Sequence, residues 1–196
     1  MQKYNHKWPT VIGGWAVWSY YPQGFGSRDV DLVLPSDDWI ETNMHKKYFK
    51  KNNFQTYPIM NQNWIESHYG KPINPKKDYL DIVYFDLLSC SHPRNDPEEL
   101  GVYVDWNWAN AFGKEIEFDG KVNIIVPEVE LLITLKIIGA LARTRLYYLA
   151  RDRTYLAGKI WKDYVDVANL ASNLSLDESK LKNHYKNSKL TKLLWQ

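Results

Sequence analysis

Hydrophobic and polar residues alternate in short runs over the first part of the chain and at helical spacing over the rest. Up to about residue 126, short apolar runs are broken by Gly, Pro and Asn, which is typical of strands and short helices. From Pro127 onward, apolar residues recur every three or four positions. We therefore expect an α/β (α+β) core over residues 1–126, followed by a C-terminal helical bundle over residues 127–196 that packs on it.

The first part of the chain is expected to contain several strands and two helices. The expected strands are 8–12, 30–34, 63–69, 79–85, 115–118 and 122–126, and the expected helices are 15–20 and 36–51. The Gly- and Pro-rich stretch 70–75 is expected to be a turn. Asp119-Gly120 between two alternating runs predicts a β-hairpin.

Three helices are expected in the second part of the chain. Pro127 suits the first turn of a helix, and Glu128 and Glu130 would lie near its positive end. Two further helices are expected over about 155–172 and 177–194.

Composition restricts the class of protein. The chain has 196 residues, 44% of them hydrophobic and 24% charged, which is ordinary for a globular domain. No apolar run is long enough to cross a bilayer, and the N-terminal residues lack the apolar stretch of a signal peptide. The single cysteine, Cys90, can form neither an internal disulfide nor a thiolate zinc site. We expect a soluble cytoplasmic protein that does not bind membranes.

Positive charge is concentrated in one segment, although the net charge is only +2. Between residues 136 and 162 there are seven basic residues and one acid. The basic residues are Lys136, Arg143, Arg145, Arg151, Arg153, Lys159 and Lys162. The segment fits either an ordinary solvated helix face or a surface for a polyanion such as RNA. Lys136 and Arg143, seven positions apart, would share one helix face.

Two aspartates, Asp29 and Asp31, stand two positions apart at the start of an expected strand. Side chains at this spacing point to the same side of a strand, so the carboxylates would lie side by side. Taken alone, the pair also fits a polar turn. A hard divalent cation such as Mg²⁺ would neutralise the two charges. Asp81, in the apolar run 79–85, is a third acid that would need a partner if it were buried.

Two glycines, Gly13 and Gly14, stand between the expected strand 8–12 and the expected helix 15–20. Without a Cβ, the backbone N–H groups at such a turn can approach phosphate oxygens. The pair alone also fits an ordinary tight turn. Together with the acids, it favours a site for a phosphate-bearing ligand and a metal.

Taken in order, these segments resemble the signature of the nucleotidyltransferase superfamily with the DNA polymerase β-like fold. The matching segments are Ile12-Gly13-Gly14, Asp29-Val30-Asp31-Leu32 and Leu80-Asp81-Ile82. Within that superfamily, Gly-Gly-Trp-Ala at 13–16, Lys136 with Arg143, and Lys-Asp-Tyr-Val-Asp at 162–166 are similar to the AbiEii-type toxin nucleotidyltransferases. The resemblance covers about residues 11–170 and implies a mixed sheet followed by helices.

The resemblance implies transfer of a nucleoside monophosphate from a nucleoside triphosphate, such as ATP, to an acceptor hydroxyl. Two Mg²⁺ or Mn²⁺ ions would serve as cofactors. The implied catalytic and metal-binding residues are Asp29, Asp31 and Asp81. The implied nucleotide-binding residues are Gly13, Gly14, Ser27, Arg28, Lys136 and Arg143.

Several alternatives remain open at this point. Asp86 competes with Asp81 as the third acid, and we favour Asp81 because 80–85 is the more strand-like run. Arg28 stands where many superfamily members have Ser or Thr. The acceptor is RNA, a protein hydroxyl or a small molecule of the aminoglycoside type, and the basic segment favours RNA. A toxin would have an antitoxin partner. A non-catalytic nucleotide-binding protein with the same fold is the alternative to an enzyme.

Overall fold

The computed structural model of the chain describes residues 8–24, 26–27, 29–36, 44–56, 65–72, 82–90 and 102–190. The strands are β1 (Thr10–Ile12), β2 (Asp29–Val33), β3 (Gln55–Thr56), β4 (Ile65–Pro72), β5 (Ile82–Leu88), β6 (Gly113–Phe118) and β7 (Val122–Pro127). The helices are α1 (Gly13–Tyr20), α3 (Met44–Lys51), α4 (Asn107–Ala111), α5 (Val129–Leu146), α6 (Arg153–Asn173) and α7 (Glu178–Asn187), with a 3-10 turn η1 (Tyr147–Leu149) between α5 and α6.

The strands within these residues form one mixed seven-stranded sheet in the order β3-β4-β5-β2-β1-β7-β6. Two neighbouring pairs, β2 with β5 and β1 with β7, are parallel, and the other pairs are antiparallel. Helices α5, α6 and α7 follow the last strand. The expected fold class, a mixed sheet followed by C-terminal helices, is confirmed.

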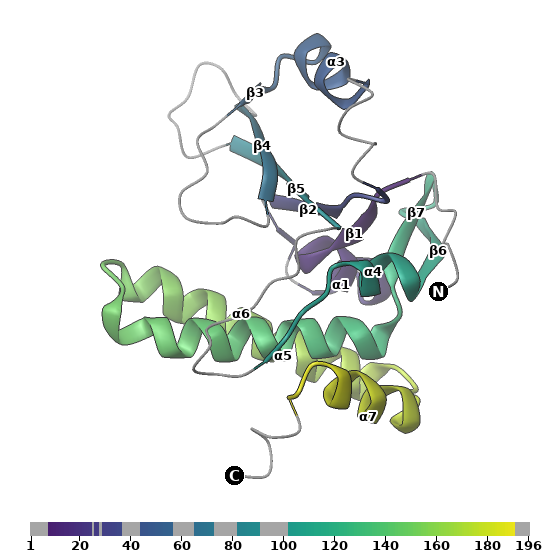
Figure 1. Cartoon of the computed structure of the whole chain (residues 1–196), viewed down its shortest axis with the longest axis vertical. Coiled ribbons are helices and arrows are strands. Elements are labelled where there is room, and N and C mark those ends of the chain that lie inside the picture. The colour runs from purple at the N-terminus through teal and green to yellow at the C-terminus, as the bar shows by residue number, and fades with distance from the viewer. Residues whose placement is uncertain are drawn as a thin grey trace.

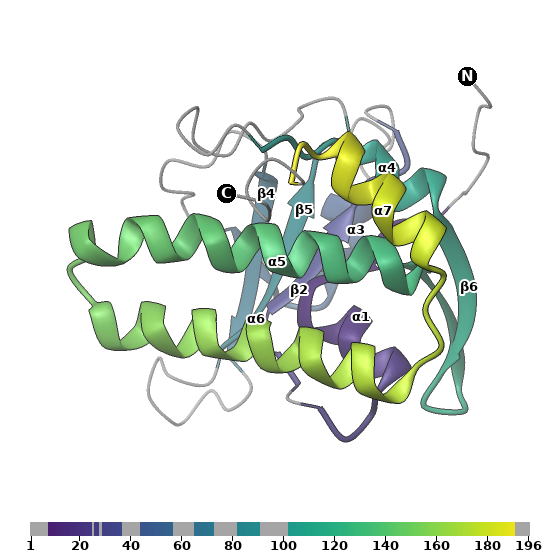
Figure 2. The ribbon, with the colours of Figure 1, turned by 90° about the horizontal axis from the view of Figure 1, so that it is seen from below.

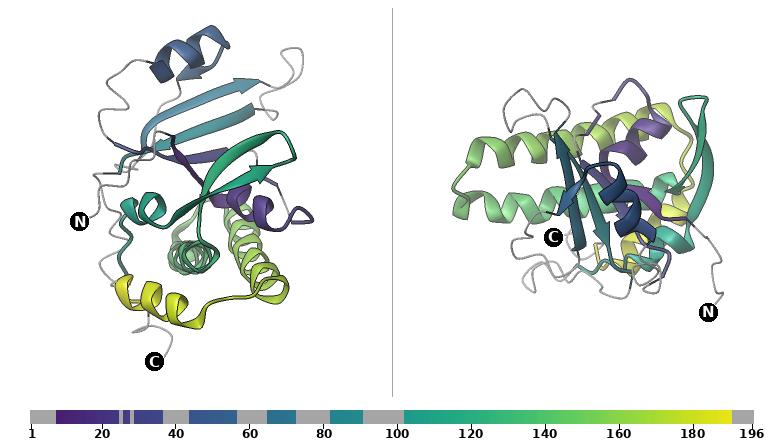
Figure 3. Two further views of the ribbon diagram at one scale, coloured as in Figure 1. Left: turned by 90° about the vertical axis from the view of Figure 1, so that its right-hand side faces the viewer. Right: turned by 90° about the horizontal axis from the view of Figure 1, so that it is seen from above.

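Helices α5 and α6 form a long antiparallel hairpin beneath the sheet, and α1 lies between this hairpin and the strands (Figure 1). Viewed from below, the end of the hairpin extends well beyond the described strands (Figure 2). Helix α7 packs on α5, while α3 lies at the opposite end of the molecule (Figure 3). The hairpin therefore reaches from the centre of the sheet into solvent.

Two hydrophobic clusters join the C-terminal helices to the sheet. In one, Ile12 and Val33 pack with Ile138 of α5. In the other, Val17 of α1 packs with Leu132 of α5, and Leu170 of α6 belongs to the same cluster. Because these side chains are almost completely buried, the hairpin is fixed against the middle of the sheet.

Several boundaries differ from those expected. The prediction that Pro127 begins a helix is wrong. Pro127 is the last residue of β7 and pairs with Gly113. The helix begins only after Glu128, whose N–H donates to Phe112 O at 2.8 Å. A proline is tolerated there because the end of a strand does not require its missing N–H.

Strands β4 and β5 both run further than expected. Residues 70–72, expected to form a turn, continue β4 and pair with residues 82–84. Strand β5 ends at Leu88, three residues later than expected, and this extension places Asp86 inside the strand. Tertiary pairing thus overrides the local Gly and Pro signals.

Helix α7 ends at Asn187, earlier than the expected 194. The last turn is closed by Leu190 N, which donates to Tyr185 O at 2.8 Å. Lys189 there has a positive φ of 60°. Within the described ranges, no helix combines the length and apolar character needed to cross a membrane.

Candidate functional site

The glycine pair lies where the sequence predicts it, between β1 and α1. Gly13 has a positive φ of 69°, a conformation that costs glycine little. A Cβ at this position would overlap Asp31 Oδ2, because the register of β1 and β2 sets Ile12 opposite Asp31. Glycine therefore lets the start of α1 lie directly against the Asp31 carboxylate.

The aspartate pair lies on β2 as expected, and β5 brings a further acid beside it. The two strands are parallel, with Asp31 opposite Asp86 and Asp29 opposite Tyr84. Residues paired in this way point to the same side of the sheet. Asp86, the alternative third acid of the sequence analysis, is thus next to Asp31. Asp81 and Arg28 lie outside the residues that the structure describes.

The Asp31 carboxylate is poorly neutralised. Burial, reinforced by the charges of Asp29 and Asp86, raises its pKa to about 7. The ammonium groups of Lys136 and Lys159 oppose this rise only in part. An additional positive charge beside Asp31 would therefore be favourable.

The Asp29 carboxylate has the opposite balance. Burial would raise its pKa, but two contacts outweigh that effect and hold the pKa below its ordinary value of 3.8. The Ser27 hydroxyl donates a hydrogen bond to Oδ1, and Lys159 Nζ lies 3.4 Å from Oδ2. Ser27, predicted as a phosphate ligand, here contacts a carboxylate.

The predicted pair Lys136 and Arg143 comes from α5 and meets acids of α6. Lys136 Nζ lies 2.9 Å from Asp163 Oδ1 and 2.7 Å from Asp166 Oδ2, and the Lys136 residue is only 8% exposed. Arg143 forms an ion pair with Asp163. Lys136 is therefore not a solvent-facing charge, and this network fixes its ammonium group near Asp31.

Helix α6 contributes two further cations that the sequence analysis did not assign to the site. Lys159 reaches Asp29, and Lys162 Nζ would be only 2.7 Å from a Cβ on Gly14. Burial, together with the nearby charge of Lys136, lowers the pKa of Lys162. The spacing offers a signal for both: positions 159, 162, 163 and 166 follow the i, i+3, i+4, i+7 pattern of one helix face.

A pocket of about 110 Å³ opens beside these residues. Gly13 and Asp31 line it from the sheet side, and Lys136, Arg143 and Asp163 line it from the helices. It contains carboxylate, cationic and backbone groups, the kinds of group that bind a metal-bound triphosphate.

The donor set fits a hard divalent cation. Asp29 and Asp31 offer oxygen ligands from one strand, and burial together with the charges of Asp29 and Asp86 makes the ionised form of Asp31 unfavourable unless a cation is added. Among the described side chains, no three His, Cys, Asp or Glu residues form a group placed to hold one ion. The two carboxylates of β2 would therefore need oxygens from the ligand to complete the coordination of a metal.

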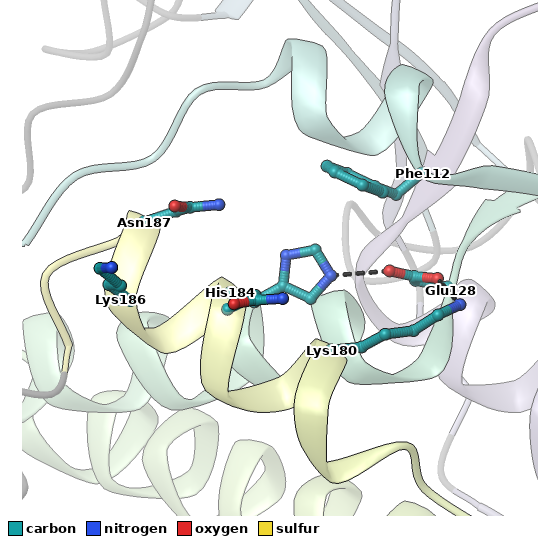
Figure 4. A pocket seen from close by; sticks show the side chains of 7 residues that line it. Phe112, Glu128, Lys180, His184, Lys186 and Asn187 are labelled. Atoms are coloured by element: carbon teal, nitrogen blue, oxygen red, sulfur yellow. Dashed lines mark hydrogen bonds and ion pairs between the residues drawn. The ribbon is translucent and has the colours of Figure 1, made fainter.

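A larger pocket, of about 450 Å³, lies between α4 and α7, away from Asp29 and Asp31 (Figure 4). His184 Nε2 lies 2.7 Å from Glu128 Oε1, and Lys180 Nζ lies 2.6 Å from Glu128 Oε2. The His184 ring also meets Phe112 edge to face. These contacts attach α7 to the start of α5.

The chain is similar to known proteins at the level of solved structures. No family model matches the chain, and no curated protein matches it. Among solved structures, the crystal structure of an antigenic nucleotidyltransferase-like protein from Paracoccidioides brasiliensis is similar, with a TM-score of 0.45 and 14% sequence identity. The match covers 92% of this chain and 84% of that one. At this level of similarity we base the assignment of function on the site itself.

Proposed function

We propose that the chain is a Mg²⁺-dependent nucleotidyltransferase that moves a nucleoside monophosphate from a nucleoside triphosphate to an acceptor hydroxyl. The observation that carries the proposal is the setting of Asp31: the register of β2 and β5 puts Asp86 beside it, and Gly13 of the glycine turn lies against its carboxylate. Acids on neighbouring strands beside a glycine turn are suited to holding a metal-bound triphosphate.

Asp29 and Asp31 would hold the metal, and Asp86 is the third carboxylate we favour over Asp81. Bound Mg²⁺ or Mn²⁺, as a pair of ions, would stabilise the negative charge of the attacking and leaving oxygens. Because burial and its acidic neighbours raise the pKa of Asp31, cation binding would restore the ionised form. Asp86 would accept the proton of the acceptor hydroxyl.

The triphosphate would lie between α1 and the α5–α6 pair. Backbone N–H groups at Gly13 and Gly14 would donate to its oxygens, and Lys162 approaches the same turn. Lys136 and Arg143 line the adjoining pocket and would offset the charge of the pyrophosphate leaving group. Ser27, which lies beside Gly14 in space, and Arg28, the next residue in the sequence, are proposed to complete the phosphate site.

The acceptor is proposed to be RNA or a small molecule with a free hydroxyl. The resemblance of residues 13–16 and 162–166 to AbiEii-type enzymes supports a role as the toxin of a toxin–antitoxin pair. Growth arrest on expression of the natural chain, absent on expression of an Asp31→Asn variant, would support that role. Equal growth of both cultures would contradict it.

The experiment that tests the enzyme is transfer of label from α-labelled nucleoside triphosphates in the presence of Mg²⁺. All four triphosphates should be screened against total RNA and a panel of hydroxylated small molecules. Asp29→Ala and Asp31→Ala are expected to abolish transfer, while Glu115→Gln, an exposed acid on β6, should leave it unchanged. Transfer that persists in both aspartate variants would overturn the proposal.

Calorimetry separates an enzyme from a non-catalytic binding protein. Triphosphate binding that requires Mg²⁺ and is lost in Asp31→Ala is expected for the enzyme. Binding of equal strength with and without metal would favour the non-catalytic nucleotide-binding protein.

A further inference from the structure

Large apolar side chains are exposed on the α5–α6 hairpin. Of the ten large hydrophobic residues exposed in the described part of the chain, six belong to this hairpin. They are Leu146, Tyr148, Leu149, Tyr155, Trp161 and Tyr164. Exposed apolar residues scattered singly need no explanation, but a concentration on one element indicates an interaction surface.

The same hairpin end is strongly basic. Exposed Arg145, Arg151 and Arg153 surround η1 and the start of α6. The acid among them, Asp152, accepts a hydrogen bond from Tyr155 N at 2.8 Å as the N-cap of α6. We call these arginines, Lys159, Lys162 and the apolar residues other than Tyr164 the hairpin surface, since Tyr164, nine residues after Tyr155, lies on the opposite side of α6. Aromatic rings interleaved with cations suit a polyanion that carries flat bases.

The hairpin surface is continuous with the carboxylate site. Lys159 Nζ lies 5.6 Å from the centre of the Tyr155 ring and 3.4 Å from Asp29 Oδ2. Arg153, six residues before Lys159, is about 9 Å away along the helix axis, at a rise of about 1.5 Å per residue. A nucleic-acid strand bound at η1 and the start of α6 would therefore need only a few nucleotides to reach Asp29.

A gap on α6 separates two of the aromatic side chains. Gly158 stands three residues after Tyr155 and three before Trp161, and a Cβ built there would meet no atom within 4 Å. Residues at this spacing are neighbours on a helix surface. The absence of a side chain at Gly158 leaves open space flanked by two exposed aromatic residues.

We propose that the hairpin surface binds single-stranded RNA, with bases stacked on Tyr155 and Trp161 and phosphates on the arginines and lysines. RNA is favoured over DNA because its terminal ribose offers two hydroxyls to a site that needs an acceptor hydroxyl. The choice of RNA over DNA and the role of this RNA as acceptor rest on the proposed function, whereas binding of a single-stranded nucleic acid to the hairpin surface does not.

The experiment is fluorescence anisotropy with a labelled ten-nucleotide single-stranded RNA of mixed sequence, without triphosphate or metal. Removing both rings in a Tyr155→Ala, Trp161→Ala variant is expected to weaken binding about tenfold or more, since each base–aromatic stack contributes substantially to affinity. Arg151→Ala with Arg153→Ala is expected to weaken binding and reduce its salt dependence.

The sharpest variant is Gly158→Glu. It fills the gap and adds a negative charge, yet glutamate favours a helix more than glycine does. We therefore expect RNA affinity to fall while the melting temperature is unchanged or higher. Matched controls are Tyr48→Ala and Trp8→Ala, since Tyr48 is 61% exposed like Tyr155, and Trp8 is 70% exposed against 67% for Trp161. Neither control should change the affinity.

Four outcomes would overturn the proposal: no RNA binding by the natural chain in 50 mM salt, unchanged affinity in Gly158→Glu, equal affinity for DNA of the same sequence, or equal affinity for polyglutamate. The last would assign the surface to an acidic protein. RNA binding without nucleotide transfer to any acceptor would overturn the proposed function and leave the docking surface standing. Transfer to a small molecule without RNA binding would support the proposed function and overturn the RNA-binding surface.

Discussion

Asp31 of β2 and Asp86 of β5 stand opposite each other in parallel register, and each carries a carboxylate on the same side of the sheet. The charge of Asp86 contributes to the raised pKa of Asp31, after burial and Asp29. Such a pair is stabilised by a cation and destabilised without one. The following predictions test this balance and the groups around it.

The stability of the metal-free protein is expected to decrease as the pH rises from about 4 to about 7. Asp31 has an ordinary pKa of 3.8, which burial and its acidic neighbours raise to about 7 in the folded chain. Between these values the folded protein keeps a proton that the unfolded chain has lost, so the free energy of unfolding decreases with pH. Above about 7 this contribution no longer changes.

Thermal unfolding in a chelator at pH 5 and pH 8 measures the effect. Asp31→Asn removes this titration, so it should reduce the pH dependence and raise the melting temperature most at pH 8. Asp119→Asn, on the exposed β6–β7 turn, should follow the natural chain. A profile that is the same in Asp31→Asn and in the natural protein would contradict the assignment.

Gly13→Ala is expected to destabilise the fold and abolish triphosphate binding. The positive φ costs a non-glycine residue about 1–3 kcal/mol, and the new methyl group would displace Asp31 Oδ2. Gly120→Ala is the matched control, because Gly120 also has a positive φ, of 62°, but its Cβ would meet no atom closer than 3.7 Å. Urea unfolding should show a loss in both variants, while calorimetry should show lost binding only in Gly13→Ala.

Lys136→Met is expected to destabilise the protein by about 3–5 kcal/mol, because it leaves the buried Asp163 and Asp166 without their shared partner. Adding Asp166→Asn to this variant should recover part of the loss. Lys121→Met removes an exposed pair with Asp119 and should cost about 1 kcal/mol or less. Equal costs for the two lysine variants in urea unfolding would show that the Lys136 network is not structural.

Lys159→Met is expected to tighten Mg²⁺ binding by up to about fivefold. Lys159 Nζ is 3.4 Å from Asp29 Oδ2, a position from which it competes with a metal ion for the carboxylate. A partly exposed pair of this kind contributes up to about 1 kcal/mol. Calorimetric titration with Mg²⁺ measures the change, and Lys182→Met, which removes an exposed pair with Glu178 on α7, is the control. Weaker Mg²⁺ binding in Lys159→Met would show that the lysine does not compete with the metal.

Local patterns in the sequence are sufficient to predict much of the fold and the first two elements of the candidate site, the glycine pair and the Asp29–Asp31 pair. The alternation around Asp119-Gly120 predicts the β6–β7 hairpin, and both residues have the positive φ values that such a turn needs. Apolar spacing predicts α5 and α6. Gly13, Asp29 and Asp31 are recognisable because each pattern depends on neighbours in the chain.

Residues distant in sequence are brought together only by tertiary structure. Periodicity alone favours Asp81 as the third acid, whereas the pairing of β5 with β2 brings Asp86 beside Asp31. Likewise, the sequence cannot distinguish a solvent-facing Lys136 from a buried one, and it is the packing of α6 on α5 that supplies Asp163 and Asp166 as its partners. The period of an element determines which side chains share a face, but what lies opposite that face depends on long-range packing.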